Sequence, residues 1–267
     1  MWYEAFLLGE LVWNFPLSVF LIGIAFFYFY ILKHYTTIKL YSKPPLLFLL
    51  ALCILYLILG TPLSAFSHLS FSLHMLQMSI LYFIIPPLIL AGIPEHMFKM
   101  IVKIPLTKII GKLFLTPKLA LFLFSLLFML YHLPVTLRIS SQIPFIQNGI
   151  LSLLFILSFS LWWPIVSPDT KQRLYKKQKR RYLFLSGILL MPACFIFIWN
   201  AWIAEVQNPF LNQITAQLCV PIESNSMNLF PSLFRTKYDQ IMAGTLMLAM
   251  HKLGMILSSY LGNTEER

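Results

Sequence analysis

Seven long apolar segments constrain what this chain of 267 residues can fold into more than any other feature of its sequence. Hydrophobic residues make up 59% of the chain and charged residues only 11%, whereas soluble proteins carry about 25% charged residues. A helix crosses the hydrocarbon core of a bilayer with about 17 to 25 mostly apolar residues. The segments of this kind are 11–32, 45–61, 71–93, 118–137, 148–166, 182–204 and 238–260. We therefore expect an all-α, polytopic transmembrane bundle of seven helices.

Basic residues are unevenly distributed among the connections between these segments. Three alternate connections carry fifteen of them, and the remaining connections carry only Arg138, Arg235 and Lys237. The fifteen are Lys33, Lys39, Lys43, Lys99, Lys103, Lys108, Lys112, Lys118, Lys171, Arg173, Lys176, Lys177, Lys179, Arg180 and Arg181. This alternation follows the positive-inside rule, and it predicts an external N-terminus and a cytoplasmic C-terminus. The net charge of +11 then reflects orientation in the bilayer and contact with anionic headgroups, so we expect no nucleic-acid partner.

The chain is expected to form a single domain over residues 1–267. Glu4 and Glu10 precede the first apolar segment at the place where a cleavable signal peptide carries basic residues. The segment is therefore interpreted as a retained first helix. The longest connection, 205–237, is too short to fold alone.

Polar and sulfur-containing side chains gather where the third predicted helix begins at the external surface. This cluster consists of His68, His74, Met75, Gln77 and Met78. Polar groups are costly in hydrocarbon and are often functional there. Imidazole and thioether ligands together suit copper, and thioether favours the cuprous ion.

Two other predicted helices bring polar residues to the same depth. His132 lies near the outer end of the fourth helix, and Asp239 and Gln240 begin the seventh. We predict an outward-facing metal layer of His68, His74 and His132, assisted by Met75 or Met78 and supported by Gln77, Asp239 and Gln240. Each residue also has a structural alternative: a hydrogen-bonded buried histidine for His74, an interfacial ring for His132, and an acid that complements a helix dipole for Asp239.

Further positions carry secondary hypotheses. Met247 and His251 share a helical face and form a possible deeper metal site, while Gly244 on that helix permits close packing. Cys219 lies in the long outer connection and is the cysteine with a plausible exposed thiol in a supporting role. Pro86-Pro87 is expected to break the third helix, and Trp162-Trp163 are interpreted as interfacial anchors at the end of the fifth.

Sequence signatures of common enzymes are absent from the chain, including the Walker loop, GxGxxG, HExxH and GxSxG. We therefore expect a protein that is not an enzyme. Two other classes stay open on the residues alone: a transporter of small solutes or metal ions, and a membrane redox module that binds quinone or haem.

The order of several motifs resembles one known family. These are FSHLSFSLHMLQMSILYFIIPPLILAGIP at 66–94, YHLP at 131–134, WWP at 162–164, LCVP at 218–221 and DQIMAG at 239–244. Together they resemble the CtaG family of cytochrome c oxidase assembly factors. The resemblance implies a seven-helix protein of the bacterial plasma membrane that helps place copper in the catalytic subunit of the oxidase. It also implies that subunit, and an external copper carrier, as partners.

Overall fold

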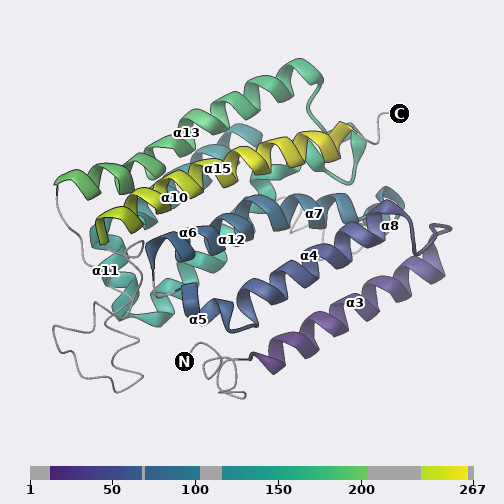
Figure 1. Cartoon of the computed structure of the whole chain (residues 1–267). Helices are drawn as coiled ribbons and strands as arrows, with labels where there is room; N and C mark the ends of the chain where they lie inside the picture. The colour runs from purple at the N-terminus through teal and green to yellow at the C-terminus, as the bar shows by residue number, and fades with distance from the viewer. Residues whose placement is uncertain (1–12, 68–69, 103–115, 204–235, 264–267) are drawn as a thin grey trace.

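The regular elements of the protein are helical throughout the described residues, which are 13–67, 70–102, 116–203 and 236–263 in a computed structural model (Figure 1). This agrees with the predicted all-α class. The helices are α3 (Phe15–Tyr35), α4 (Lys43–Leu59), α5 (Leu63–Ser67), α6 (Phe71–Ser79), the π-helix η1 (Ile80–Ile84), α7 (Ile85–Gly92), α8 (Glu95–Val102), α10 (Pro117–Tyr131), α11 (Pro134–Gln142), α12 (Pro144–Val166), the 3₁₀ turn η2 (Thr170–Gln172), α13 (Lys176–Ile203) and α15 (Thr236–Asn263).

Within the described ranges, five helices are long and apolar enough to cross a membrane. They are Phe15–Tyr35, Phe71–Gly92, Phe145–Val166, Lys176–Trp202 and Lys237–Asn263. Two shorter apolar helices, α4 and α10, occupy the remaining predicted segments. Large apolar side chains are also exposed on the outside of the bundle, including Phe26 and Trp199. Length, composition and this apolar exterior make the chain a membrane protein.

The fourth predicted span, 118–137, is shorter in the structure than in the prediction. α10 ends at Tyr131, and His132 is its C-terminal cap residue. The chain then starts a separate helix, α11, with Pro134 in its first turn. Proline is favoured at the start of a helix because its missing N–H is not needed there, and it therefore divides the predicted span into two.

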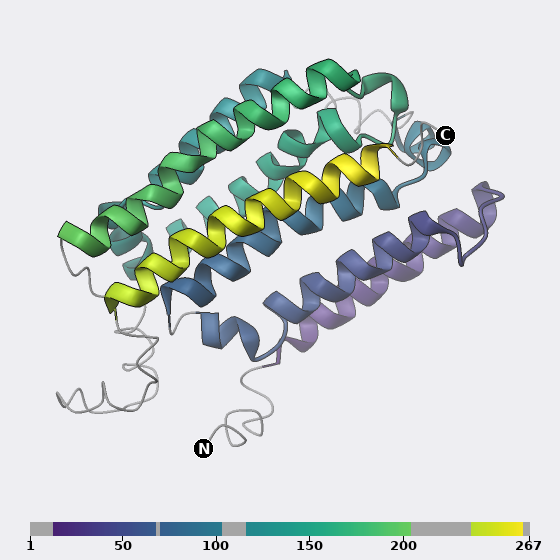
Figure 2. The same cartoon turned by 45° about the horizontal axis from the view of Figure 1, so that its top comes forward.

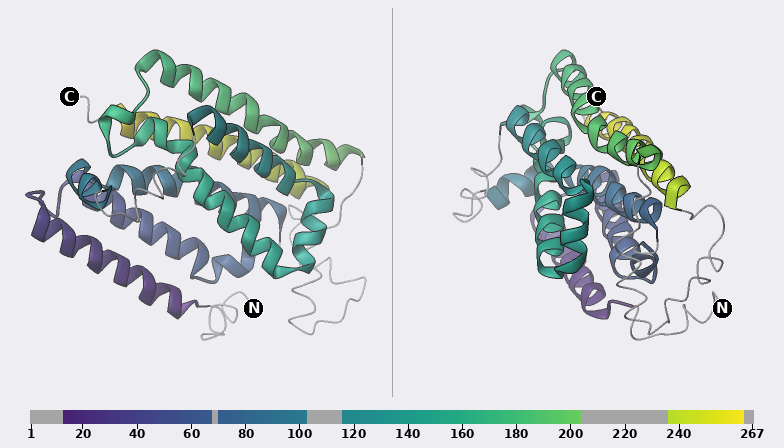
Figure 3. Two further views of the ribbon diagram at one scale, coloured as in Figure 1. Left: turned by 180° about the vertical axis from the view of Figure 1, so that it is seen from behind. Right: turned by 90° about the vertical axis from the view of Figure 1, so that its left-hand side faces the viewer.

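The helix formed by α6, η1 and α7 lies in the middle of the bundle. α6 packs mainly against α15, and α7 packs mainly against α4. α13 lies alongside α15, whereas α3 lies at the periphery against α4 (Figure 2). α10 and α12 form the face seen from behind in Figure 3. The start of α6 and the end of α10 meet at the same end of the bundle, and this places their side chains together.

The expected break at Pro86-Pro87 takes the form of a π-turn just before the two prolines. Neither proline has an N–H, so the carbonyl of Tyr82, four residues before Pro86, loses its helical donor. The indole Nε1–H of Trp162 donates to that carbonyl at 2.8 Å. Trp162 is buried, so its interpretation as an interfacial anchor was wrong.

Two glycines allow α15 to approach its neighbours closely. A Cβ on Gly244 would lie 2.6 Å from the Cys194 carbonyl oxygen of α13, and one on Gly254 would lie 2.7 Å from the Phe83 carbonyl oxygen of η1. The prediction of close packing at Gly244 is confirmed. Small residues of this kind let membrane helices pack backbone to backbone.

Candidate functional site

The N-terminus of α6 is held by a carboxylate from another helix. Asp239 of α15 accepts hydrogen bonds from the backbone N–H of Phe71 at 2.6 Å and of Ser72 at 3.0 Å. The Ser72 hydroxyl also donates to it, at 2.6 Å. The first N–H groups of a helix have no partner within the helix, and an acid near them is favoured by the dipole. Asp239 therefore positions the helix that carries the candidate ligands, and the dipole that it complements is that of α6.

Two consecutive residues of α6 meet the last residue of α10 and the cap residue that follows it. His74 Nε2 lies 3.2 Å from the Tyr131 hydroxyl oxygen. Met75 Sδ lies 3.1 Å from His132 Nε2. The structure thus brings His74, Met75 and His132 together at the meeting point of two helices.

The ring of His132 has a defined orientation. Its Nδ1 is hydrogen-bonded to the carbonyl oxygen of Phe128, one turn earlier in α10. A carbonyl oxygen only accepts, so Nδ1 carries the proton, and a neutral ring then has its lone pair on Nε2. The atom that faces the Met75 sulfur is therefore a nitrogen able to act as a ligand, oriented through the opposite side of the ring as metal-binding histidines usually are.

Gln77, Met78 and Gln240 are further predicted members of the layer. Gln77 Nε2 donates to the Ile58 carbonyl oxygen at 2.7 Å and thereby ties α6 to the end of α4. Met78 and Gln240 are both buried. Gln77 thus serves as a link between helices.

The layer is buried. The exposed fractions are 1% for His74, 0% for Met75 and 1% for His132. An outward-facing layer implies side chains that are partly exposed, but these three are enclosed within the bundle. Met75 belongs to the hydrophobic core together with Phe71, Phe128 and Tyr131, and the His132 ring centroid lies 4.3 Å from that of Phe128.

The deeper pair lies close to the π-turn. His251 Nε2 lies 3.2 Å from the Ser186 hydroxyl oxygen of α13, and its ring centroid lies 5.0 Å from that of Phe83. Met247, one turn earlier on α15, is fully buried. The Ser186 contact gives the buried imidazole a hydrogen-bonding partner.

Two predicted residues, His68 and Cys219, lie outside the described residues. Among the residues that the structure does describe, no group of three or more histidine, cysteine, aspartate or glutamate side chains could hold a metal ion. The pair of His132 and Met75 is a different kind of arrangement, because it joins one imidazole to one thioether.

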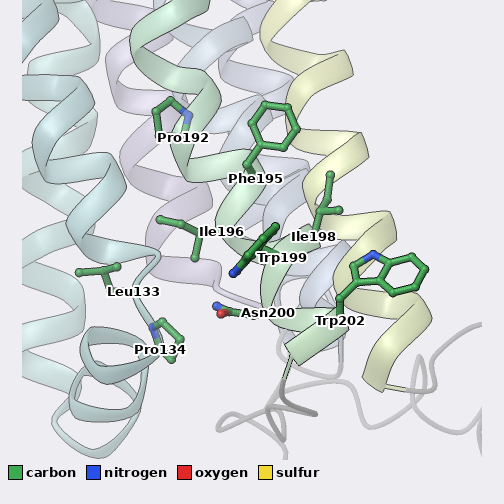
Figure 4. Close-up of a pocket in the computed structure, with 9 residues that line it drawn as sticks. All are labelled: Leu133, Pro134, Pro192, Phe195, Ile196, Ile198, Trp199, Asn200 and Trp202. Carbon is green, nitrogen blue, oxygen red and sulfur yellow. The ribbon is translucent and has the colours of Figure 1, made fainter.

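An apolar groove opens directly beside the layer, between the α10–α11 junction and α13 (Figure 4). Its volume is about 790 Å³. Leu133 and Pro134, which follow His132 in the chain, form one wall, and Trp199 and Trp202 of α13 contribute to the other. Asn200 is a polar member of this lining. The groove brings the outer surface of the bundle close to the backbone of His132.

Sequence reasoning assigned no role to Tyr131 or Ser72, and it interpreted Trp162 only as an interfacial anchor. Each makes a hydrogen bond to an element distant in the chain, to His74, Asp239 and the Tyr82 carbonyl respectively. Tyr131 was indicated only by its position next to His132. Pro86-Pro87 indicated the need for a donor such as Trp162, because a double proline leaves carbonyls that require a donor from outside the helix.

Comparison with known proteins gives a match to one family model. The model described as cytochrome c oxidase caa3 assembly factor (CtaG) matches residues 24–261. Neither the curated proteins nor the solved structures give a significant match to the chain. The matched region runs from α3 through the end of α15 and includes both helices that form the layer. The chain therefore belongs to the family of cytochrome c oxidase caa3 assembly factors.

Proposed function

We propose that this protein assists assembly of cytochrome c oxidase by delivering copper to, or inserting it into, the catalytic subunit. The layer of His74, Met75 and His132 holds the ion in transit, and His68 and Met78 complete the proposed ligand set. Copper is the cargo, and the protein acts without catalytic turnover. Membership of the assembly factor family makes the oxidase the partner, and the layer supplies the chemistry.

The contact between His132 and Met75 is the observation that carries this proposal. In the neutral ring, Nε2 directs a lone pair at a sulfur atom that also carries lone pairs, at 3.1 Å. Two lone pairs that face each other repel, so this contact is stabilised most by a cation that binds both atoms. An imidazole nitrogen and a thioether sulfur prefer cuprous over harder cations.

Charge at the layer also favours a monovalent cation. Histidine and methionine ligands are neutral, so a bound ion keeps its full charge in a medium of low dielectric constant, where charge is costly. A cuprous ion carries one charge and therefore costs less than a divalent ion. The Asp239 carboxylate is bound to the amide of Ser72, three residues before Met75, which is less than one helical turn. Its negative charge offsets that of the ion.

Burial of the layer supports a role in transfer. An ion enters or leaves only when side chains at this end of α6 and α10 move apart, which shields it from water and from other thiols. Docking of the oxidase subunit, or of an external copper carrier, against the groove beside His132 is the proposed trigger for this opening.

We also propose that the chain crosses the bacterial plasma membrane seven times, with the N-terminus outside and the C-terminus in the cytoplasm. Lys43 begins α4 and Lys99 belongs to α8. The start of α4 and α8 lie at the end of the bundle opposite the start of α6 (Figure 1), which supports an external layer. Reporter domains fused at Asp169 and within 220–230 test this orientation. Activity of a cytoplasmic reporter at Asp169 and of an external reporter within 220–230 is expected, and the reverse at either position contradicts the proposal.

The decisive experiment is the copper content of the oxidase purified from a strain that lacks this protein. We expect normal amounts of oxidase polypeptide with a deficit of copper and of activity. Complementation with His132→Ala should fail to restore either quantity, whereas complementation with Met97→Leu, a buried methionine of α8, should restore both. Fully metallated, active oxidase in the deletion strain contradicts the proposal.

A further inference from the structure

Four cations cover one face of the first turns of α13, at the end of the bundle opposite the layer. They are Lys176, Lys177, Arg180 and Arg181, and together with Phe184 they line a hollow of about 660 Å³. All five side chains are exposed.

Neighbouring cations of the same basic run are used by the fold. Lys179 is buried, and its ammonium donates to the Asn263 side-chain oxygen at 2.8 Å. The guanidinium of Arg173 donates to the Gly262 carbonyl oxygen at 3.3 Å. Both therefore neutralise the carbonyl end of α15, where cations are favoured.

The four exposed cations have no comparable structural role. Among the described residues, no side-chain hydrogen bond or ion pair joins any of them to another residue. They repeat at a spacing of four residues, and like charges at that spacing destabilise a helix. They also lie in its first turns, where the dipole disfavours positive charge. Their concentration at this place therefore points to an anion from outside the chain.

An apolar groove continues from this hollow between α13 and α15. Its volume is about 670 Å³, and most of its lining is apolar, with Leu183 and Phe184 of α13 and Met255, Ile256 and Tyr260 of α15. Lys252, Ser259 and Asn263 of α15 are its polar lining residues. Phe184 lines both the hollow and the groove. A cationic hollow and an apolar groove are thus joined along the membrane face of one helix pair.

We propose that this composite surface binds one anionic phospholipid, with the headgroup phosphate on the four cations and an acyl chain in the groove between α13 and α15. Charge complementarity selects the phosphate, and the apolar groove selects a ligand that also carries hydrocarbon. Basic pockets between transmembrane helices bind anionic headgroups by the same chemistry. The proposal is independent of copper and of the His132–Met75 contact.

The test compares two variants that remove the same charge from the same end of the bundle. One replaces Lys176, Lys177, Arg180 and Arg181 by glutamine. The control replaces four exposed lysines by glutamine: Lys33 of α3, Lys39 of the connection that follows it, Lys43 of α4 and Lys118 of α10. Both proteins are reconstituted into phosphatidylcholine discs with or without phosphatidylglycerol, extracted in mild detergent, and analysed by native mass spectrometry and by titration with phosphatidylglycerol.

We expect wild type and control to retain one phosphatidylglycerol, and the α13 variant to bind it at least about tenfold more weakly, as loss of several surface cations predicts. Ser259→Phe, which narrows the groove, should weaken binding while leaving all four cations in place. Equal losses of phosphatidylglycerol affinity in the α13 variant and the control would show that the effect comes from general surface charge, and this would overturn the proposal. Competition by glycerol phosphate as strong as that by the lipid would also overturn it, because the groove would then contribute nothing.

Discussion

The carboxylate of Asp239 accepts the backbone N–H of Phe71 at 2.6 Å and so joins the first turn of α15 to the first turn of α6. The two residues are distant in the chain, and both are buried. The contact fixes the axial position of α6, and with it the height at which Met75 meets His132. Asp239 is therefore a positioning residue for the layer.

Asp239→Ala should destabilise the protein by about 2 kcal/mol, because it leaves buried amide donors of α6 without their charged acceptor. Asp239→Asn retains one acceptor oxygen and should cost roughly half as much. The measurement is thermal unfolding of the purified protein in detergent, followed by tryptophan fluorescence. Glu95→Gln is the control, because its ion pair with Lys99 is at the surface and such pairs contribute little. A melting temperature equal for Asp239→Ala and Glu95→Gln would contradict the positioning role.

His132→Ala and Met75→Leu should each weaken cuprous binding by at least about tenfold, as expected when one of few soft ligands is lost. Leucine conserves the volume of methionine, so the core should stay packed. Competition with a cuprous chelator under anaerobic conditions measures the affinity. His74→Ala should have a smaller effect, because His74 Nε2 is engaged by the Tyr131 hydroxyl. Unchanged affinity in both His132→Ala and Met75→Leu would remove these residues from the ligand set.

Trp162→Phe should lower stability by about 1–3 kcal/mol, because the buried carbonyl of Tyr82 loses its indole donor. Trp163→Phe provides a matched control. The Trp163 indole donates to the exposed side chain of Gln172 at 2.8 Å, where water can replace it. Equal melting temperatures for the two variants would show that the π-turn does not depend on this donor.

Gly244→Ala should destabilise the packing of α13 on α15 by about 1–3 kcal/mol, as overpacking of a tight contact does. The added methyl would meet the Cys194 carbonyl oxygen at 2.6 Å, whereas a methyl at Gly149 of α12 meets nothing within 4 Å. Gly149→Ala is therefore the control. Its melting temperature should equal or exceed that of wild type, since alanine favours helix. A Gly244→Ala protein as stable as Gly149→Ala would contradict the close approach of the two backbones.

The depth at which the layer lies in the bundle could be predicted from the sequence. Apolar segment length and the alternation of basic residues place His74, near the start of its helix, and His132, near the end of its helix, at the same end of the bundle. The structure brings both helices together there. Asp239 belongs to the same level for the same reason. Depth follows from a count of residues along a helix, so it needs no knowledge of the neighbours.

The direction in which each side chain points could not be predicted. A membrane helix is apolar on all sides, so its hydrophobic pattern does not identify the face that meets a given neighbour. Gln77 was placed with the ligands, but it faces the end of α4. The location of Tyr131 opposite His74 also depends on how α6 and α10 pack, which the sequence of either helix alone does not encode.

The π-turn at Ile80–Ile84 has a consequence for how the central helix is built. A π-turn adds one residue to an α-helix, and one residue corresponds to a rotation of about 100°. The first half, α6, and the second half, α7, therefore have separate angular phases, which allows α6 to pack on α15 and α7 on α4. Removing one residue from this turn would restore a continuous helix, but it would bring the wrong side of one half against its neighbour.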